Sequence, residues 1–102
     1  MYTLSSGKVP FDSWLVGLRD SRARAKIRVK IDRMQAGNFA DHRSVGEGVY
    51  ELRIDYGPGY RVYYTLARKR IVLLLAGGDK SSQGEDIATA IGYWKDYKGH
   101  RG

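Results

Sequence analysis

Hydrophobic and polar residues alternate along residues 50–66, which read YELRIDYGPGYRVYYTL. Two segments rich in Tyr, Ile, Leu and Val flank Gly57, Pro58 and Gly59, whose backbone preferences suit a short loop. The pattern predicts a β-hairpin that closes around those three residues.

The predicted hairpin has two faces of different character, because strand side chains alternate between the faces of a sheet. One face is apolar and carries Leu52, Ile54, Val62 and Tyr64. The other face carries Glu51, Arg53, Asp55, Arg61 and Tyr63. In this register Asp55 would lie opposite Arg61, and Arg53 would lie opposite Tyr63. The apolar face needs a covering layer, whereas the charged face needs a separate explanation.

Apolar residues at helical spacing predict three helices elsewhere in the chain. The first begins at Pro10 and ends near residues 19–20. The second begins with Ser21 as its cap and ends before Gly37. The third opens at Ser82, which has capping-box spacing to a glutamate. Their apolar stripes are Phe11, Trp14, Leu15 and Leu18; Ala23, Ile27, Ile31 and Met34; and Ile87, Ala88, Ala90, Ile91 and Trp94.

Shorter segments complete the predicted sheet. Residues 1–4 are a weak terminal strand, residues 43–45 a short strand, and residues 46–48 a turn or bulge. The continuous apolar segment at residues 71–76 predicts a strand buried on both faces, and residues 98–102 are expected to fray. The order β-α-α-β-β-β-β-α indicates one α+β domain over residues 1–102. We expect helices on one face of an antiparallel sheet and a partly open opposite face.

Composition narrows the function classes. The chain has 102 residues, 42% of them hydrophobic, which favours a globular fold. It has no cysteine, which excludes a disulfide framework and a cysteine-ligated metal. No signal peptide or membrane-spanning run is recognised, so we expect a cytoplasmic protein without a membrane partner. The net charge of +7 favours anionic partners, namely nucleic acid, an acidic protein or a membrane surface.

Positive charge concentrates on the predicted second helix. Its polar positions carry Arg22, Arg24, Lys26, Arg28, Lys30 and Arg33, with Asp32 as the only acid among them. Two interpretations stay open: a solvated helix face, or a docking surface for RNA phosphates or an acidic partner. In the second case Arg24, Arg28 and Lys30 are the candidate contacts.

Arg53 and Arg61 are the strongest candidates for chemistry, because they share a face on neighbouring strands. Lys80 follows the apolar strand through a double glycine and would approach them if that strand pairs beside the hairpin. Such a cationic pocket suits a phosphodiester. Alternatively, Asp55 pairs with Arg61 and Glu51 partly neutralises Arg53, as surface ion pairs worth roughly 0–1 kcal/mol each. In that case Lys80 is a solvated loop lysine.

The two histidines, His42 and His100, form no metal-ligand or triad pattern with their neighbours. The sequence therefore indicates neither a metal site nor a cofactor.

The segments GEGVYELRIDYGPGYRVYY and LLLAGGDKSSQGEDIATA resemble the RelE/ParE superfamily of bacterial toxins. More narrowly, they resemble its HigB-like, phage-related "addiction module killer" branch, from Phe11 to about Trp94. The resemblance implies a compact RelE-like fold, with two N-terminal helices and a C-terminal helix packed on an antiparallel sheet. It also implies a toxin of a type II toxin-antitoxin system, neutralised by a cognate, often helix-turn-helix (HigA-like) antitoxin that represses the operon on operator DNA.

Many members of this superfamily are ribosome-dependent mRNA endonucleases, in which the 2′-hydroxyl of the mRNA attacks the adjacent phosphate. The family's basic active-site positions map onto Arg53, Arg61 and Lys80, and Arg43 sits where many relatives have a lysine. Tyr63 is a further candidate for RNA contact.

The chain lacks the C-terminal histidine and the clear carboxylate base of better-studied relatives. The general base therefore stays open among Glu51, Asp55 and Tyr63. A ParE-like poison of DNA gyrase and a non-catalytic basic domain that acts only with its antitoxin are the alternative functions.

Overall fold

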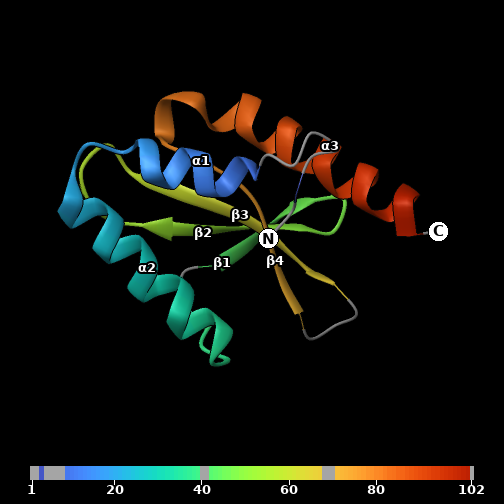
Figure 1. Ribbon diagram of the computed structural model, residues 1–102, viewed down its shortest axis with the longest axis horizontal. Helices are drawn as coiled ribbons and strands as arrows, with labels where there is room; N and C mark the ends of the chain where they lie inside the picture. The colour runs from blue at the N-terminus through green and yellow to red at the C-terminus, as the bar shows by residue number, and fades with distance from the viewer. Residues whose placement is uncertain (1–2, 4–8, 40–41, 68–70, 102) are drawn as a thin grey trace.

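A meandering antiparallel sheet forms the centre of the molecule (Figure 1). The computed structural model describes residues 3, 9–39, 42–67 and 71–101. Within this part of the chain the strands are β1 (His42–Gly46), β2 (Val49–Ile54), β3 (Tyr60–Ala67) and β4 (Ile71–Gly78), in the order β1-β2-β3-β4. Sequential neighbours pair because their connections are short. The expected terminal strand at residues 1–4 lies outside the described residues, apart from Thr3.

The helices are α1 (Pro10–Gly17), α2 (Ser21–Gln35) and α3 (Gln83–Arg101), and a short 3-10 helix, η1 (Lys80–Ser82), precedes α3. The α+β class is confirmed. The expected fraying from residue 98 is wrong, since α3 continues to its last described turn, where the Lys98 ammonium lies 5.1 Å from the centre of the Trp94 ring. No helix among the described residues is long and apolar enough to cross a membrane.

Aspartates cap α2 and η1: Asp20 takes the role expected for Ser21, and Asp79 caps the 3-10 turn that contains Ser82. The Asp20 carboxylate accepts backbone N–H bonds from the second and third residues of α2, at 2.9 and 3.3 Å. Asp79 accepts the backbone N–H of Ser81 at 2.9 Å, because η1 extends the helical segment ahead of Ser82. Each carboxylate satisfies N–H groups that lack partners in the first turn.

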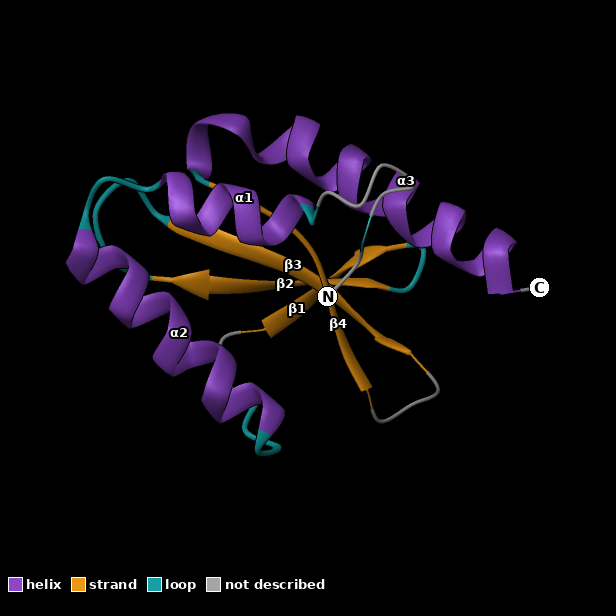
Figure 2. Ribbon diagram, in the orientation of Figure 1, coloured by secondary structure: helices purple, strands orange, loops and turns teal. Residues whose placement is uncertain are grey.

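Both faces of the sheet are covered, which corrects the expectation of helices on one face only. Figure 2 shows the strands lying between α2 and α3. The first core combines α1, α2 and one sheet face, namely Phe11, Leu15, Ile27, Ile31, Met34, Leu52, Ile54, Val62, Tyr64 and Leu74. The second core lies under α3 and consists of Val49, Tyr63, Ala67, Leu73, Leu75, Ala76 and Ala90. The apolar run of β4 serves both cores, as the sequence predicted.

The hairpin of β2 and β3 keeps its predicted faces but not its predicted register. Arg53 pairs with Arg61 and Ile54 with Tyr60, so the loop is two residues longer than expected. A shift of two residues preserves the alternation of faces. The longer loop has contacts of its own: the Gly59 N–H donates to the Tyr56 carbonyl at 3.1 Å, and the Tyr56 hydroxyl donates to the Asp20 carboxylate at 3.0 Å, at the start of α2.

Candidate functional site

A cationic pocket of about 600 Å³ lies where the β2–β3 hairpin meets the start of η1. Its lining residues are His42, Arg43, Arg53, Ile54, Asp55, Gly59, Tyr60, Arg61 and Lys80. Three arginines and one lysine face a single carboxylate in this set. The pocket therefore favours an anionic ligand.

Arg53 and Arg61 lie directly opposite each other on β2 and β3. Like charges in directly opposed positions destabilise a sheet by roughly 0.2–1 kcal/mol. The two side chains differ in exposure, since Arg53 is exposed whereas Arg61 is only 7% exposed. No ion pair to Arg53 is found among the described residues, so the expected neutralisation by Glu51 is wrong.

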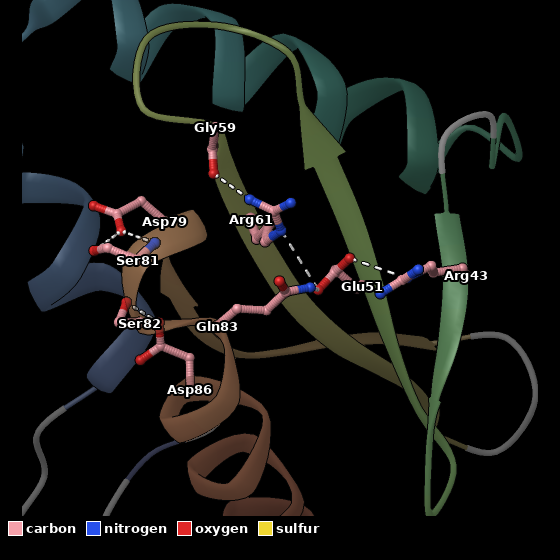
Figure 3. A network of polar contacts seen from close by, with 9 residues as sticks. All are labelled: Arg43, Glu51, Gly59, Arg61, Asp79, Ser81, Ser82, Gln83 and Asp86. Atoms are coloured by element: carbon pink, nitrogen blue, oxygen red, sulfur yellow. Dashed lines mark hydrogen bonds and ion pairs between the residues drawn. The ribbon is translucent and has the colours of Figure 1, made fainter.

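Arg61 is anchored on two sides (Figure 3). Its Nη1 donates to the Gly59 carbonyl at 2.7 Å, and its Nε lies 3.7 Å from Glu51 Oε2. The alternative pairing of Arg61 with Asp55 is not found among the described contacts. A guanidinium has five N–H donors in a planar fork, so donors remain on Arg61 for a ligand in the pocket.

Glu51 is the buried carboxylate beneath these cations, with a fully buried side chain. Its Oε1 lies 3.3 Å from Arg43 Nε, and its Oε2 accepts a hydrogen bond from Gln83 Nε2 at 2.8 Å. Arg43, Arg61 and Gln83 come from β1, β3 and α3 (Figure 3). One acidic side chain therefore connects three elements around the pocket.

Gly59 allows the arginine and the lysine to approach the same loop. Its φ of +79° is a left-handed conformation that favours glycine. An added Cβ there would lie 3.2 Å from Arg61 Nη1 and 3.6 Å from Lys80 Cβ. Lys80 follows β4 as the first residue of η1, so Arg53, Arg61 and Lys80 line one pocket as expected. Their roles in catalysis stay a prediction.

The residues expected to contact RNA differ in exposure and in position relative to the pocket. Arg43 lines the pocket and is exposed. Tyr63 is not open to a base, because its side chain is fully buried beneath α3; the expectation of RNA contact there is wrong. Burial and the nearby Glu51 carboxylate raise the pKa of Tyr63 well above its ordinary value.

On α2 the candidates differ from one another, and none lines the pocket. Arg24 donates through Nη1 to the Leu18 carbonyl, which fixes the corner between α1 and α2. Arg28 is exposed, and Lys30 is half-buried. The basic helix is therefore partly structural and partly open surface.

Two pocket residues were missed by sequence reasoning, His42 and Tyr60. His42 Nδ1 lies 2.6 Å from the Tyr64 hydroxyl, and its ring stacks on Tyr50 with centres 5.3 Å apart. Burial raises the pKa of Tyr64 to about 12, so that hydroxyl stays protonated near neutrality. A search for partners near in sequence could not find His42, because its partners lie on β2 and β3. Tyr60 could have been identified from the sequence, because it directly precedes Arg61.

A metal centre has no support in the described part of the chain, where no group of three or more His, Asp or Glu residues could hold an ion. The described residues that line the pocket include arginine, lysine, histidine and carboxylate side chains.

A family model described as "Phage derived protein Gp49-like (DUF891)" matches residues 13–91. The chain belongs to this Gp49-like family. The matched range includes the pocket residues Arg43, Arg53, Arg61 and Lys80. The Gp49-like chain is 55% identical over 80 residues to an uncharacterized protein of Haemophilus influenzae, which covers 78% of this chain and 81% of the relative. No solved structure matched it.

Proposed function

We propose that this Gp49-like protein is the toxin of a type II toxin-antitoxin system, in the HigB-like branch of the RelE/ParE superfamily. In this proposal it is a ribosome-dependent mRNA endonuclease. The observation that carries the proposal is the direct opposition of Arg53 and Arg61 at a pocket that also holds Lys80. Two opposed arginines destabilise the free protein, whereas a phosphodiester between them would be bound by both.

The reaction would proceed by attack of the mRNA 2′-hydroxyl on the adjacent phosphorus. The 2′-O–P bond forms and the P–O5′ bond breaks, while the 2′-hydroxyl loses a proton and the 5′-oxygen gains one. Negative charge develops on the non-bridging oxygens in between. Fixed cations aimed at such oxygens are often the largest source of catalysis, and the loss of one such group costs about 10²–10³ in rate.

Arg61 fits the role of a fixed phosphate clamp, since Gly59 and Glu51 hold it on two sides. Arg53 and Lys80 would supply charge from the rim of the pocket. In-line geometry would come from the ribosome, which holds the mRNA, and orientation of this kind can account for a large part of a rate enhancement. A site with few catalytic side chains could therefore suffice for cleavage.

Proton transfer requires a base with access to the pocket. Of Glu51, Asp55 and Tyr63, only Asp55 lines it. Glu51 and Tyr63 are fully buried, and the raised pKa of Tyr63 makes its phenolate scarce near neutral pH. His42 also lines the pocket and is a further candidate.

The partners implied by this function are the ribosome with its mRNA and a cognate helix-turn-helix antitoxin, through which the toxin would reach operator DNA. These partners would place the protein in the cytoplasm. The exposed part of the α2 face, including Arg28, is the proposed second contact with ribosomal RNA or with the antitoxin.

Induction of the protein in cells, followed by mapping of mRNA 5′ ends, tests the proposal. We expect codon-phased cuts within translated regions, and no growth arrest from a soluble, folded Arg61→Ala protein. Intact mRNA together with double-strand DNA breaks would instead identify a ParE-like gyrase poison. Absence of both effects would identify a domain that acts only with its antitoxin.

A further inference from the structure

We propose that Glu51 is a positioning residue that fixes the guanidinium of Arg61 for phosphate binding, and that Gln83 in turn fixes Glu51. This inference rests on the proposed function and deepens it. It assigns the buried acid at the site to orientation rather than to proton transfer.

Glu51 is close to the pocket but does not line it. Its side chain is fully buried. Oε2 accepts a hydrogen bond from Gln83 and lies near Arg61, whereas Oε1 has an ion pair with Arg43 but no hydrogen bond. A general base must come within hydrogen-bond reach of the proton that it removes. A carboxylate enclosed in this way lacks that access, so Glu51 acts through its neighbours.

Two contacts restrain the Arg61 guanidinium on one edge: a hydrogen bond at Nη1, and at Nε an ion pair that is too long for a hydrogen bond. Gly59 accepts from Nη1 at 2.7 Å, and Glu51 lies 3.7 Å from Nε. These contacts flank the Nε–Nη1 edge, which leaves the Nη2 hydrogens for an anion in the pocket. Without the carboxylate, a nearly buried cation would lack its counter-charge and would reorient toward water.

Gln83 supplies the fixed point for this arrangement. It is the first residue of α3, and its amide Nε2 donates to Glu51 Oε2 at 2.8 Å (Figure 3). The hydrogen bond ties the carboxylate to the helix that covers the second core. The orientation of Arg61 therefore depends on the docking of α3, although α3 contributes no residue to the pocket lining.

The first test observes Arg61 directly and requires no cleavage. NMR of protein labelled with ¹⁵N at arginine gives an Nε–Hε signal, which the Arg61→Lys variant assigns by its absence. In the wild type we expect hydrogen exchange of this signal at least about tenfold slower than that of exposed Arg53, because the atom is buried. In Glu51→Gln the signal should shift and lose this protection while the backbone amide spectrum is retained. An unchanged Arg61 signal in folded Glu51→Gln would overturn the proposal.

The second test measures cleavage of mRNA on programmed ribosomes. Glu51→Gln should lower kcat by about 10²-fold, with KM changed much less and the shape of the pH–rate profile retained. Because Glu51 acts through Arg61, the double variant Glu51→Gln/Arg61→Ala should be no slower than Arg61→Ala alone. A double variant tenfold or more slower, or a profile that loses one limb, would make Glu51 an independent catalytic group and overturn the inference.

Two further variants distinguish a loss of Arg61 orientation from a general loss of structure. Gln83→Ala leaves the charge of Glu51 in place, and we expect about a tenfold loss of kcat with a smaller change in the Arg61 signal. Glu47→Gln makes the same chemical change at an exposed ion pair, whose Oε2 lies 4.0 Å from Lys95 Nζ, and should leave both readouts unchanged. Equal effects of Glu47→Gln and Glu51→Gln would contradict the proposal. If the wild type cuts no mRNA, the proposed function fails, and the NMR result still decides whether Glu51 orients Arg61.

Discussion

Replacement of Arg53 by glutamine should make the protein more stable while removing the proposed cleavage activity. The pair Arg53–Arg61 is a directly opposed like-charge pair, and no described acid neutralises the exposed partner. Such a pair costs roughly 0.2–1 kcal/mol. With a middle value of about 0.5 kcal/mol, the Tm of a domain of this size should rise by about 2–4 °C.

Thermal unfolding of Arg53→Gln and wild type, side by side at low and high salt, measures this gain. The Debye length falls from about 10 Å at 0.1 M to about 3 Å at 1 M salt, so the difference in Tm should shrink at high salt. Arg53→Lys is the matched control, because it keeps the positive charge and should show no gain. Cleavage by Arg53→Gln should fall by about 10²–10³.

Unfolding of Arg53→Gln at a lower temperature than wild type in low salt would contradict a repulsion between the two arginines. The same gain in Arg53→Lys would also contradict it, because the effect would then come from side-chain shape rather than charge. If Arg53→Gln is more stable than wild type but less active, the opposed arginines serve ligand binding at the expense of stability.

Other perturbations follow from the same structure. The Tyr56 hydroxyl holds the pKa of Asp20 below its ordinary 3.8. The ionised Asp20 therefore stabilises the fold above pH 3.8, and this contribution is lost as pH falls through the folded-state pKa. Asp20→Asn should reduce the pH dependence of the free energy of unfolding on the acid side. Burial raises the pKa of Tyr64 from 10.0 to about 12, so the free energy of unfolding should fall between those pH values, and Tyr64→Phe should remove part of that fall. Gly59→Ala should cost about 1–3 kcal/mol in urea unfolding and slow cleavage, because it strains a left-handed residue and crowds Arg61.

Much of the fold was predictable because it follows from local patterns. The 3.6-residue periodicity of Ile27, Ile31 and Met34 and the alternation of Leu52 and Ile54 place these residues in the first core. The α3 layer was not predictable from such patterns. The apolar residues of α3 show which side of the helix is buried, but not which face of the sheet it covers. The charged residues on the second face of the sheet suggested that this face is open to solvent.

The sheet face that carries the site was predictable, but the pairing of its residues across the strands was not. The alternation of side chains placed Arg53 and Arg61 on one face, whereas their direct opposition depends on the loop length. In that loop Tyr56 bonds to Asp20, 36 residues away, a contact without a local signal in the sequence. The enclosure of Glu51 by Arg43 and Gln83 also depends on contacts between distant elements. A single sequence carries no local signal for such contacts.

In the proposed reaction the cationic pocket promotes attack by an mRNA 2′-hydroxyl. The most direct test of this reaction gives purified wild-type protein and programmed ribosomes an mRNA with one 2′-deoxy nucleotide immediately 5′ of the scissile phosphate. We predict cutting of the all-ribose mRNA with a 2′,3′-cyclic phosphate end, no cutting at the deoxy position, and no cutting of either by folded Arg61→Ala. Cleavage of the deoxy mRNA at the wild-type rate, or an intact all-ribose mRNA, would contradict the account.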